Sequence, residues 1–364
     1  MKTEKITIAK VKPGMVLTED VYNSVDQLVL SAGTVLSDHS ITRLKFYSIR
    51  EVTVSYEVKK RPPRQKKEPE NFVSYTEFVK KSDDFKNFSN AYTNSLNSVE
   101  DRMRAFAATG KDLDTEALLN NVADVYSTVA SHGQLFDMLM CIRDLDDITF
   151  VHGLNVAIIC TVFAQWLGFN RKDSDVLILS GLLHDIGKLS IPENILKKKS
   201  ALTEEEFNII KGHSKAGYDL LKGINIDSRI PLAALQHHER SNGSGYPDGL
   251  MASHINEFAK IVAIADVYDA MTAARSYRGP ICPLEVLNIF ENDGLSKYDP
   301  KYLLTFMEHV ISTYLNQYVL LSNGQIGEIV MVNKHSPARP IVRLLNSECI
   351  DLSTERDINI VGIV

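Results

Sequence analysis

Apolar residues recur at every third or fourth position from residue 72 to residue 315, and this spacing predicts a bundle of helices. Shorter apolar runs with turn residues between them lie on both sides of this region. They predict a small β-containing module at residues 1–58 and a second one at residues 316–364, with Asn323-Gly324 as a hairpin turn. The pattern therefore predicts a mainly α protein, with an all-helical domain between two small β modules.

Two segments interrupt this pattern. Residues 59–71 are charged and rich in proline, a composition that cannot build a core, and they predict a solvated linker. Their basic run leaves open a contact with a membrane surface or with nucleic acid. Residues 238–256 are dense in Gly, Ser, Asn and Pro and predict a long loop between two apolar helices, a kind of loop that is often functional. Thr203 and Glu206 form a capping box ahead of an apolar stripe and predict a helix start.

The composition is that of a globular protein. Of the 364 residues 44% are hydrophobic and 24% charged, so the chain can bury a core and is not disordered as a whole. The formal net charge of −6 gives no overall basic field, which argues against a nucleic-acid polymer as partner. The longest apolar run, residues 156–169, is too short to span a bilayer and predicts a buried helix without membrane insertion. The four cysteines form no C-x-x-C pair, and no signal peptide is evident, so we expect reduced thiols and a cytoplasmic protein.

Seven histidines and aspartates in the helical region lie on or beside apolar segments. A helix bundle builds metal sites by pointing such side chains inward from several helices. Each residue alone is also explained as a hydrogen-bonded core residue, but burying so many titratable groups without a shared partner is costly. The seven candidate metal ligands are His152, His184, Asp185, His213, His237, His238 and Asp266.

These donors favour a pair of metal ions. Imidazole and carboxylate together suit iron, manganese, zinc, nickel or cobalt, and seven donors are too many for one tetrahedral zinc. Adjacent helical residues point about 100° apart, so His184 and Asp185 fit best if Asp185 bridges two ions and His184 binds one of them. Two ions about 3.5–4 Å apart are suited to displacement at phosphorus.

The same residues resemble a known family. The string HDIGK at residues 184–188, IPENIL after it, HHER with GSGYPDGL at residues 237–250, and ADVYDAMTAARSYR at residues 265–278 resemble the HD-GYP family of bacterial cyclic dinucleotide phosphodiesterases. The resemblance is close over residues 146–278 and weaker over the rest of the helical domain. It does not extend to the two β modules.

The resemblance implies an all-helical HD-superfamily bundle that hydrolyses cyclic di-GMP to pGpG, and on to GMP in some cases. A metal-bridged hydroxide would attack phosphorus at a centre of iron or manganese, and the seven residues named above match the family's ligands. Asp185 and Lys188 would then be catalytic. Lys188 lies one turn after the ligand pair and is expected near the scissile phosphate.

Further residues match substrate-binding positions of the family. Arg275 and Arg278 correspond to basic residues that face the ligand phosphates, although Arg278 is also explained as a solvated helix end. Tyr246 would edge the pocket and stack on guanine, and a role in stabilising the turn is equally consistent with the sequence.

Some positions depart from the family pattern. Asn242-Gly243 stands where Asp-Gly is usual, and Lys199-Ser200 replaces Pro-Gly, but neither change removes a catalytic group. Members with a third metal carry a glutamate where this chain has Ile148, so we expect two divalent ions, iron or manganese.

Two alternatives stay open on the sequence. One is a phosphodiesterase for 3′,3′-cyclic GMP-AMP, because base selection depends on a few pocket contacts. The other is a receptor that binds cyclic di-GMP without cutting it and uses the β modules as an output surface. The sequence also leaves open a homodimer, a protein partner for the β modules, the input signal and the physiological metal.

Overall fold

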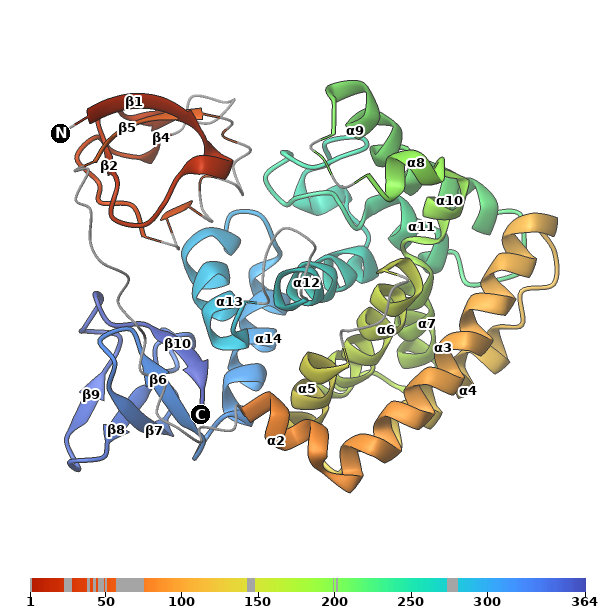
Figure 1. The fold of residues 1–364 in the computed structure, drawn as a ribbon. Helices are drawn as coiled ribbons and strands as arrows, with labels where there is room; N and C mark the ends of the chain where they lie inside the picture. Colours follow the sequence, from red (N-terminus) through yellow and green to blue (C-terminus); the bar gives the residue numbers. More distant parts are fainter. Residues whose placement is uncertain are drawn as a thin grey trace. The chain divides into compact units, whose positions relative to one another are not determined.

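The computed structural model describes residues 2–22, 28–37, 51–56, 75–142, 148–198, 202–273 and 281–364, together with positions 40, 41, 44, 49 and 200. The chain divides into two compact units, residues 1–72 and residues 73–364 (Figure 1). Each unit is described by itself. The predicted linker at residues 59–71 lies outside the described residues.

The first unit contains short strands around a small core of its own. The strands are β1 (Lys2–Thr7), β2 (Val16–Leu17), β3 (Val21–Tyr22), β4 (Leu28–Leu30) and β5 (Glu51–Tyr56). An antiparallel sheet has the order β1-β5-β2, and β3 pairs with β4. Leu17 and Val54, which pair across this sheet, are fully buried with Leu36. The prediction of a β-containing N-terminal module is thus confirmed for the described residues.

The second unit begins with helices. They are α2 (Tyr75–Lys81), α3 (Asp83–Thr109), α4 (Thr115–Tyr126), α5 (His132–Cys141), α6 (Ile148–Trp166), α7 (Arg171–Leu183), α8 (Glu193–Leu196), α9 (Glu204–Lys211), α10 (His213–Leu221), α11 (Arg229–Gln236), α12 (Glu257–Thr272), α13 (Pro283–Ile289) and α14 (Pro300–Thr313). Short 3₁₀ turns cover Ile186–Ser190 (η2) and Ala252–His254 (η3), and a π turn covers Phe290–Gly294 (η4).

Helices α6 and α12 form the centre of this unit. Both are apolar on nearly every face, which is typical of helices that are surrounded by others. In α6 the window Thr149–Trp166 is long and apolar enough to cross a membrane, with a mean hydropathy of 1.3, but 72% of it is buried inside the protein. Its hydrophobicity is therefore that of a core helix.

Side-chain caps fix where several helices begin. The hydroxyl of Ser82 accepts a hydrogen bond at the start of α3, and Asn170 does the same for α7. At α9 the predicted capping box of Thr203 and Glu206 is present with both of its hydrogen bonds. The starts of α7 and α9 are thereby fixed, and with them the positions of the segments that follow these helices into the centre of the bundle.

The chain ends in a five-stranded antiparallel sheet. Its strands are β6 (Tyr318–Leu321), β7 (Ile326–Met331), β8 (Ile341–Leu344), β9 (Cys349–Asp351) and β10 (Ile360–Ile363), in the order β10-β6-β7-β8-β9. The predicted hairpin turn joins β6 and β7, with Gly324 at a φ of 85°.

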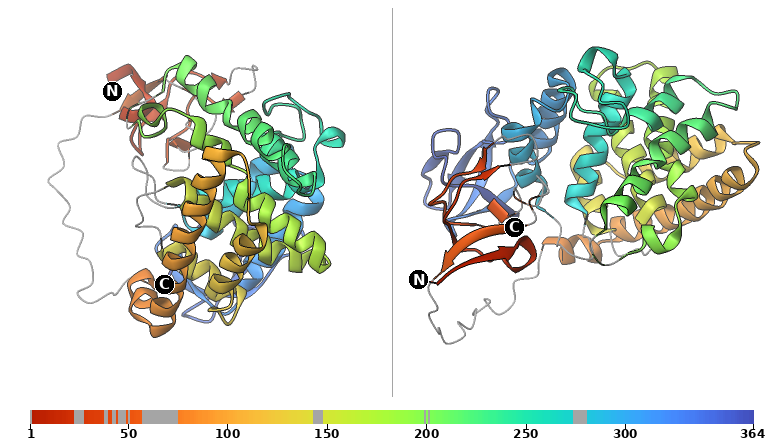
Figure 2. Two further views of the ribbon diagram at one scale, coloured as in Figure 1. Left: turned by 90° about the vertical axis from the view of Figure 1, so that its right-hand side faces the viewer. Right: turned by 90° about the horizontal axis from the view of Figure 1, so that it is seen from above.

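This sheet packs on the helices that precede it. Val319 and Val342 belong to the same buried cluster as the apolar residues of α13 and α14. The amide of Ala338 donates to the carboxylate of Glu291 in η4 at 2.9 Å. Figure 2 shows the sheet beside these two helices. The mainly α fold class with terminal β modules is confirmed, and the C-terminal module is continuous with the helical core.

Candidate metal centre

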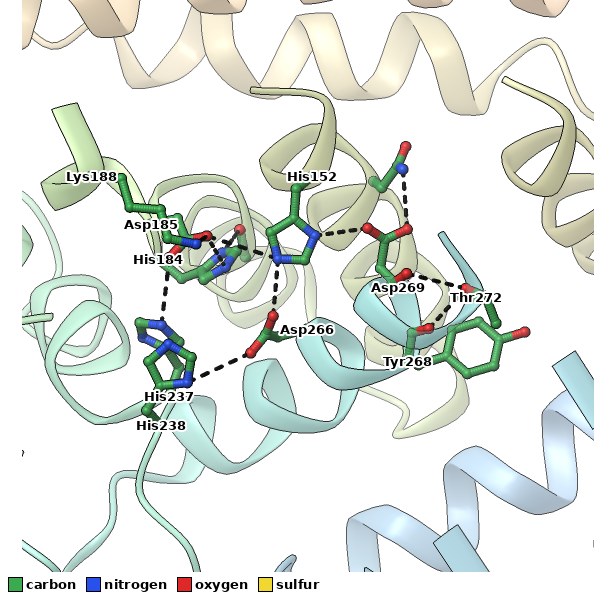
Figure 3. Close-up of polar contacts among 12 residues, drawn as sticks. His152, His184, Asp185, Lys188, His237, His238, Asp266, Tyr268, Asp269 and Thr272 are labelled. Atoms are coloured by element: carbon green, nitrogen blue, oxygen red, sulfur yellow. Dashed lines mark hydrogen bonds and ion pairs between the residues drawn. The ribbon is translucent and has the colours of Figure 1, made fainter. Parts of the chain in front are cut away.

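The seven predicted ligands come together from five segments of the helical unit. Figure 3 labels all of them except His213. His152 lies on α6, His184 and Asp185 directly follow α7, and His213 is the first residue of α10. His237 and His238 directly follow α11, and Asp266 lies on α12. Their donor atoms form two groups, each with all atoms within 4.8 Å of one another. One group is His152, His184 and Asp266, and the other is Asp185, His213, His237 and His238.

Asp185 belongs to the second group and also reaches the first. Its Oδ2 atom is 3.2 Å from Nε2 of His184 and 3.8 Å from Nε2 of His152. Its Oδ1 atom is 3.3 Å from Nε2 of His213 and 3.7 Å from Nε2 of His237. One carboxylate oxygen therefore faces each group, which is the arrangement that a bridging ligand requires.

Helix ends set the protonation pattern of three of these histidines. The Nδ1 atoms of His184, His213 and His237 lie 2.7, 2.5 and 3.0 Å from the carbonyl oxygen three residues earlier. A carbonyl oxygen can only accept a hydrogen bond, so Nδ1 carries the proton in each ring. In the neutral ring Nε2 is then left with a lone pair directed into the cluster.

Several of the inward-facing acceptor atoms lie close together with few donors to satisfy them, although the Ser214 hydroxyl lies 3.4 Å from Nε2 of His213. The Nε2 atoms of His213 and His237 lie 3.3 Å apart, and both carry lone pairs by the argument above. His184 Nε2 and Asp185 Oδ1 are buried and have no hydrogen-bond partner among the described residues. Burying unpaired acceptors is costly. Cations placed between these atoms would satisfy them, so the donor set fits divalent metal ions.

The pKa values of the second group keep its donors ready to bind a cation. Burial lowers the pKa of His213 and of His237, and it lowers the pKa of His238 to about 3 although Asp266 opposes the shift. These rings are therefore neutral at pH 7. Burial acts to raise the pKa of Asp185, but the positive charge of Lys188 opposes this effect, and the pKa lies well below its usual range.

His152 is held between two carboxylates. Its Nε2 atom is 2.9 Å from Oδ1 of Asp266, and its Nδ1 atom is 2.7 Å from Oδ2 of Asp269. Burial acts to lower the pKa of His152, but the hydrogen bonds to these two aspartates raise it to about 10. The other oxygen of Asp269 accepts from the Asn155 amide at 3.1 Å, and Tyr92 donates to Asn155 at 2.7 Å.

Asp269 was not among the sequence-predicted residues. The available signal is its spacing, because Asp266 and Asp269 are three apart on α12 and so share one face of the helix. A carboxylate on the outer nitrogen of a ligand histidine fixes the orientation of the ring and raises its basicity. Asp269 thus supports His152 from behind the candidate centre.

Lys188 and Gly187 belong to η2, which directly follows the ligand pair. The Lys188 ammonium forms an ion pair with Oδ2 of Asp185, so it lies where the sequence places it, next to the centre. A Cβ atom on Gly187 would lie only 2.0 Å from the carbonyl oxygen of His213 and 2.5 Å from the amide of Gly217. The glycine therefore lets η2 approach α10 closely enough to bring Asp185 to His213.

The predicted loop after α11 is folded around a buried glutamate. Both oxygens of Glu239, which is 2% exposed, accept backbone hydrogen bonds, from Asp248 at 2.7 Å and from Leu250 at 2.8 Å. A Cβ on Gly245 would lie 2.4 Å from the Glu239 Cα atom, so the loop passes directly over this residue. Glu239 was also missed from the sequence, where the only signal is a carboxylate that directly follows two ligands.

The remaining predicted positions are placed as follows. The Tyr246 ring lies against the His238 ring, with centroids 4.6 Å apart and the planes tilted by 31°, so it lies beside the centre. Asn242 accepts a hydrogen bond from the Ser244 amide at 3.1 Å, a turn contact that an aspartate would also make. Arg275, Arg278 and Lys199 lie outside the described residues, as does the side chain of Ile148.

Comparisons with known proteins identify the family of the chain. A model of the HD domain family matches residues 118–302. The chain is 30% identical over 243 residues to the protein named cyclic di-GMP phosphodiesterase PA4108 of Pseudomonas aeruginosa, covering 66% of this chain and 58% of the relative. It is 43% identical over 145 residues to 3′3′-cGAMP-specific phosphodiesterase 1 of Vibrio cholerae, covering 40% of this chain and 34% of the relative.

The fold also matches a solved structure. The protein Bd1817 of Bdellovibrio bacteriovorus, described as an HDG"Y"P protein, superposes with a TM-score of 0.50 at 19% identity. The match covers 84% of this chain and 98% of that one. By contrast, the chain spans only about a third to three fifths of the two curated relatives named above.

Proposed function

The chain belongs to the HD domain family and, within it, to the HD-GYP proteins, and on this premise we propose that it is a metal-dependent phosphodiesterase acting on cyclic di-GMP. The product is pGpG, with GMP as a second product where cleavage continues. The seven clustered residues are the ligands in this proposal, and iron or manganese is the metal, because mixed nitrogen and oxygen donors suit both ions.

One observation carries the proposal. Asp185 turns one oxygen toward each of two groups of donors, and the apposed Nε2 atoms of His213 and His237 have no proton to share. A single structural ion would leave one group unused. Two ions would use both groups, with Asp185 available to each of them, and would supply the chemistry needed for displacement at phosphorus.

Bound metal ions would activate water at neutral pH and neutralise charge on the phosphoryl oxygens. The residues of the chain hold and orient the reactants. Lys188 lies at the Asp185 carboxylate with its side chain 22% exposed, so it is available to a phosphate oxygen that enters the centre. Tyr246 borders the centre beside His238, where its ring can contact the substrate. Arg275 and Arg278 are proposed to bind phosphate on the family resemblance alone.

A second substrate is favoured by one comparison. The relative with 43% identity is named as specific for 3′3′-cGAMP, whereas the longer match is to a protein named for cyclic di-GMP. Both are cyclic dinucleotides with two phosphodiesters and differ in one purine. We therefore propose cyclic di-GMP as substrate and 3′,3′-cyclic GMP-AMP as the alternative.

A cytoplasmic location is proposed on the cysteines. Cys141 and Cys160 are buried, and the four cysteines form no disulfide with one another. Free thiols are typical of a reducing compartment.

The test is a turnover assay under anaerobic conditions on protein loaded separately with iron and with manganese. Chromatography would resolve each cyclic dinucleotide, its linear product and the mononucleotides. We expect metal-dependent cleavage that is lost in Asp185→Asn, while Asp219→Asn, a matched change of an exposed carboxylate on α10, keeps it. Binding without cleavage under every metal would indicate a receptor and would overturn the proposal.

A further inference from the structure

Helix α9 carries an aromatic residue at the surface close to the candidate centre. Phe207 is 45% exposed, and no residue of α9 is buried. The helix is held instead by its capping box and by the ion pair between Lys198 and Glu206, with Nζ and Oε1 2.7 Å apart. The packing of the bundle therefore gives no reason for a phenylalanine at this position.

Phe207 is connected to the candidate centre through a row of side chains that contact one another. The Lys211 ammonium lies 4.7 Å from the centroid of the Phe207 ring and 5.7 Å from that of the Tyr246 ring. The Tyr246 ring in turn contacts the ring of His238, one of the candidate ligands, in a tilted arrangement. We call Phe207, Lys211 and Tyr246 the α9 strip. The α9 strip leads from the candidate centre to the surface. Tyr246 is the aromatic residue at its inner end, and Phe207 is the one at its outer end.

Lys211 is available to an anion. Three other lysines near it form ion pairs with carboxylates, namely Lys198, Lys215 and Lys222. Among the residues that the structure describes, no carboxylate lies within ion-pair distance of Lys211. Its contacts are the two aromatic rings, which fix the position of the ammonium without neutralising its charge.

We propose that the α9 strip binds the half of the cyclic dinucleotide that is not being cut. This inference rests on the proposed function. A cyclic dinucleotide has two phosphates and two purines in one ring, so when one phosphate is at the centre the second nucleotide must lie beside it. Lys211 pairs with the second phosphate and Phe207 stacks on the second base, for which an exposed aromatic ring beside a cation is well suited.

The test uses variants of the full, metal-loaded chain. Phe207→Ala and Lys211→Gln each remove one contact, while Phe207→Trp and Lys211→Arg retain it. Ile209→Ala is the matched control, because Ile209 is 43% exposed on the same helix and does not belong to the strip. We expect KM for the cyclic dinucleotide to rise about tenfold in the first pair, with the effect falling on KM more than on kcat.

Metal content and the fold are measured in parallel, by elemental analysis and circular dichroism. Wild-type metal content with a raised KM supports the inference, as does rescue by Phe207→Trp and Lys211→Arg. If the wild type cleaves the substrate and both removing variants keep the wild-type KM, the inference is wrong and the proposed function stands. The inference is also wrong if Ile209→Ala raises KM equally, because the effect would then be a general one of α9. A metal-loaded wild type that cleaves no cyclic dinucleotide overturns both proposals.

Discussion

Asp269 determines which nitrogen of His152 faces the candidate centre. As a carboxylate it can only accept, so the Nδ1 atom 2.7 Å away must carry the proton of the ring. The Nε2 atom, which faces Asp266, is then the nitrogen of His152 that would hold a metal ion. Asp269 contacts the outer nitrogen of His152 and so controls which nitrogen of that ring is free to bind a metal ion.

We expect Asp269→Asn to weaken metal binding about 10- to 100-fold, because an amide can donate to Nδ1 and favour the wrong form of the ring. The measurement is a competition titration with a chelator of known affinity. Asp219→Asn on the surface of α10 is the matched control and should bind like the wild type. An unchanged metal affinity in Asp269→Asn would show that the carboxylate has no part in orienting His152.

Among single residues, the sequence predicts the members of the cluster better than the residues that support them. His184 and Asp185 are adjacent polar residues in an apolar segment, and that pattern is visible without a structure. Asp269 and Glu239 look like ordinary charged residues beside the ligands. Their roles depend on contacts with α6 and with the loop after α11, and a single sequence does not report such contacts. Arg275 and Arg278 stay predictions.

Among the elements, the loop at residues 239–250 depends most on one side chain. Glu239 holds two backbone amides of this loop, those of Asp248 and Leu250, and it is almost fully buried. The loop also carries Tyr246 against His238. The contacts of Glu239 therefore determine both the shape of the loop and the position of Tyr246 at the border of the centre.

In Glu239→Gln one carboxylate oxygen becomes an amide NH₂ group that faces a backbone N–H. We expect the substitution to lower the local stability of the loop by about 1–3 kcal/mol, so that the loop opens more often. Hydrogen exchange followed by mass spectrometry should show faster exchange at residues 246–250 and unchanged exchange in α6. Glu257→Gln, on the first turn of α12, is a control outside the loop. Wild-type protection of the loop in Glu239→Gln would refute this role.

A group of ion pairs connects the start of α7 with the start of α11. Arg229 donates to both oxygens of Asp227, each at 2.9 Å, and to Asp173 at 2.7 Å. These hydrogen bonds lower the pKa of Asp227 from 3.8 to about 2. Because the pKa is lowered in the folded state, the contribution of Asp227 to stability is complete above about pH 4 and is lost as the pH falls toward 2.

We expect Asp227→Asn to lower the free energy of unfolding by about 1–2 kcal/mol at pH 7, a figure reduced for the partial exposure of the pair. The difference between wild type and variant should shrink as the pH falls toward 2. Urea unfolding at a series of pH values measures it. A difference that stays constant with pH would mean that the ion pair is not its source.

The sequence predicts helices and strands well where a short motif marks the start of a helix or the turn of a hairpin. The capping box at Thr203 and the hairpin at Asn323-Gly324 both follow from short motifs and are confirmed. The exposure of α9 does not follow from its pattern. Its apolar positions mark a helix, but the pattern cannot say whether another element covers them, and Phe207 and Ile209 are left at the surface.

For the molecule as a whole, local patterns indicate the modules but not their packing. The alternation in β6 predicts a strand with one buried face, and it does not say that Val319 shares a core with α13 and α14. Such contacts join residues far apart in the chain, so neither composition nor periodicity reports them. The same long-range packing brings α6, α7, α10, α11 and α12 to one centre.

Because five segments supply the ligands, bound metal should stabilise the whole second unit. An ion that binds only the folded chain adds about 4 kcal/mol at a thousandfold excess over its Kd, which corresponds to roughly 5–10 °C in Tm for a unit of this size. Trp166, the only tryptophan of the chain, lies on α6 and so reports on this unit alone. Its fluorescence gives Tm for protein treated with EDTA and for the same protein after manganese is added back.

We expect EDTA to lower Tm and manganese to restore it. Asp266→Asn should lose most of the gain, since it removes a charged donor from the first group, whereas Asp219→Asn should keep it. Magnesium is the ion control, because it favours all-oxygen sites and this centre presents mainly imidazole nitrogens. Equal Tm values with and without manganese, in protein shown by elemental analysis to be first free of metal and then loaded, would mean that the seven residues do not act together as one site. A gain that persists in Asp266→Asn would place the stabilising ion elsewhere in the chain.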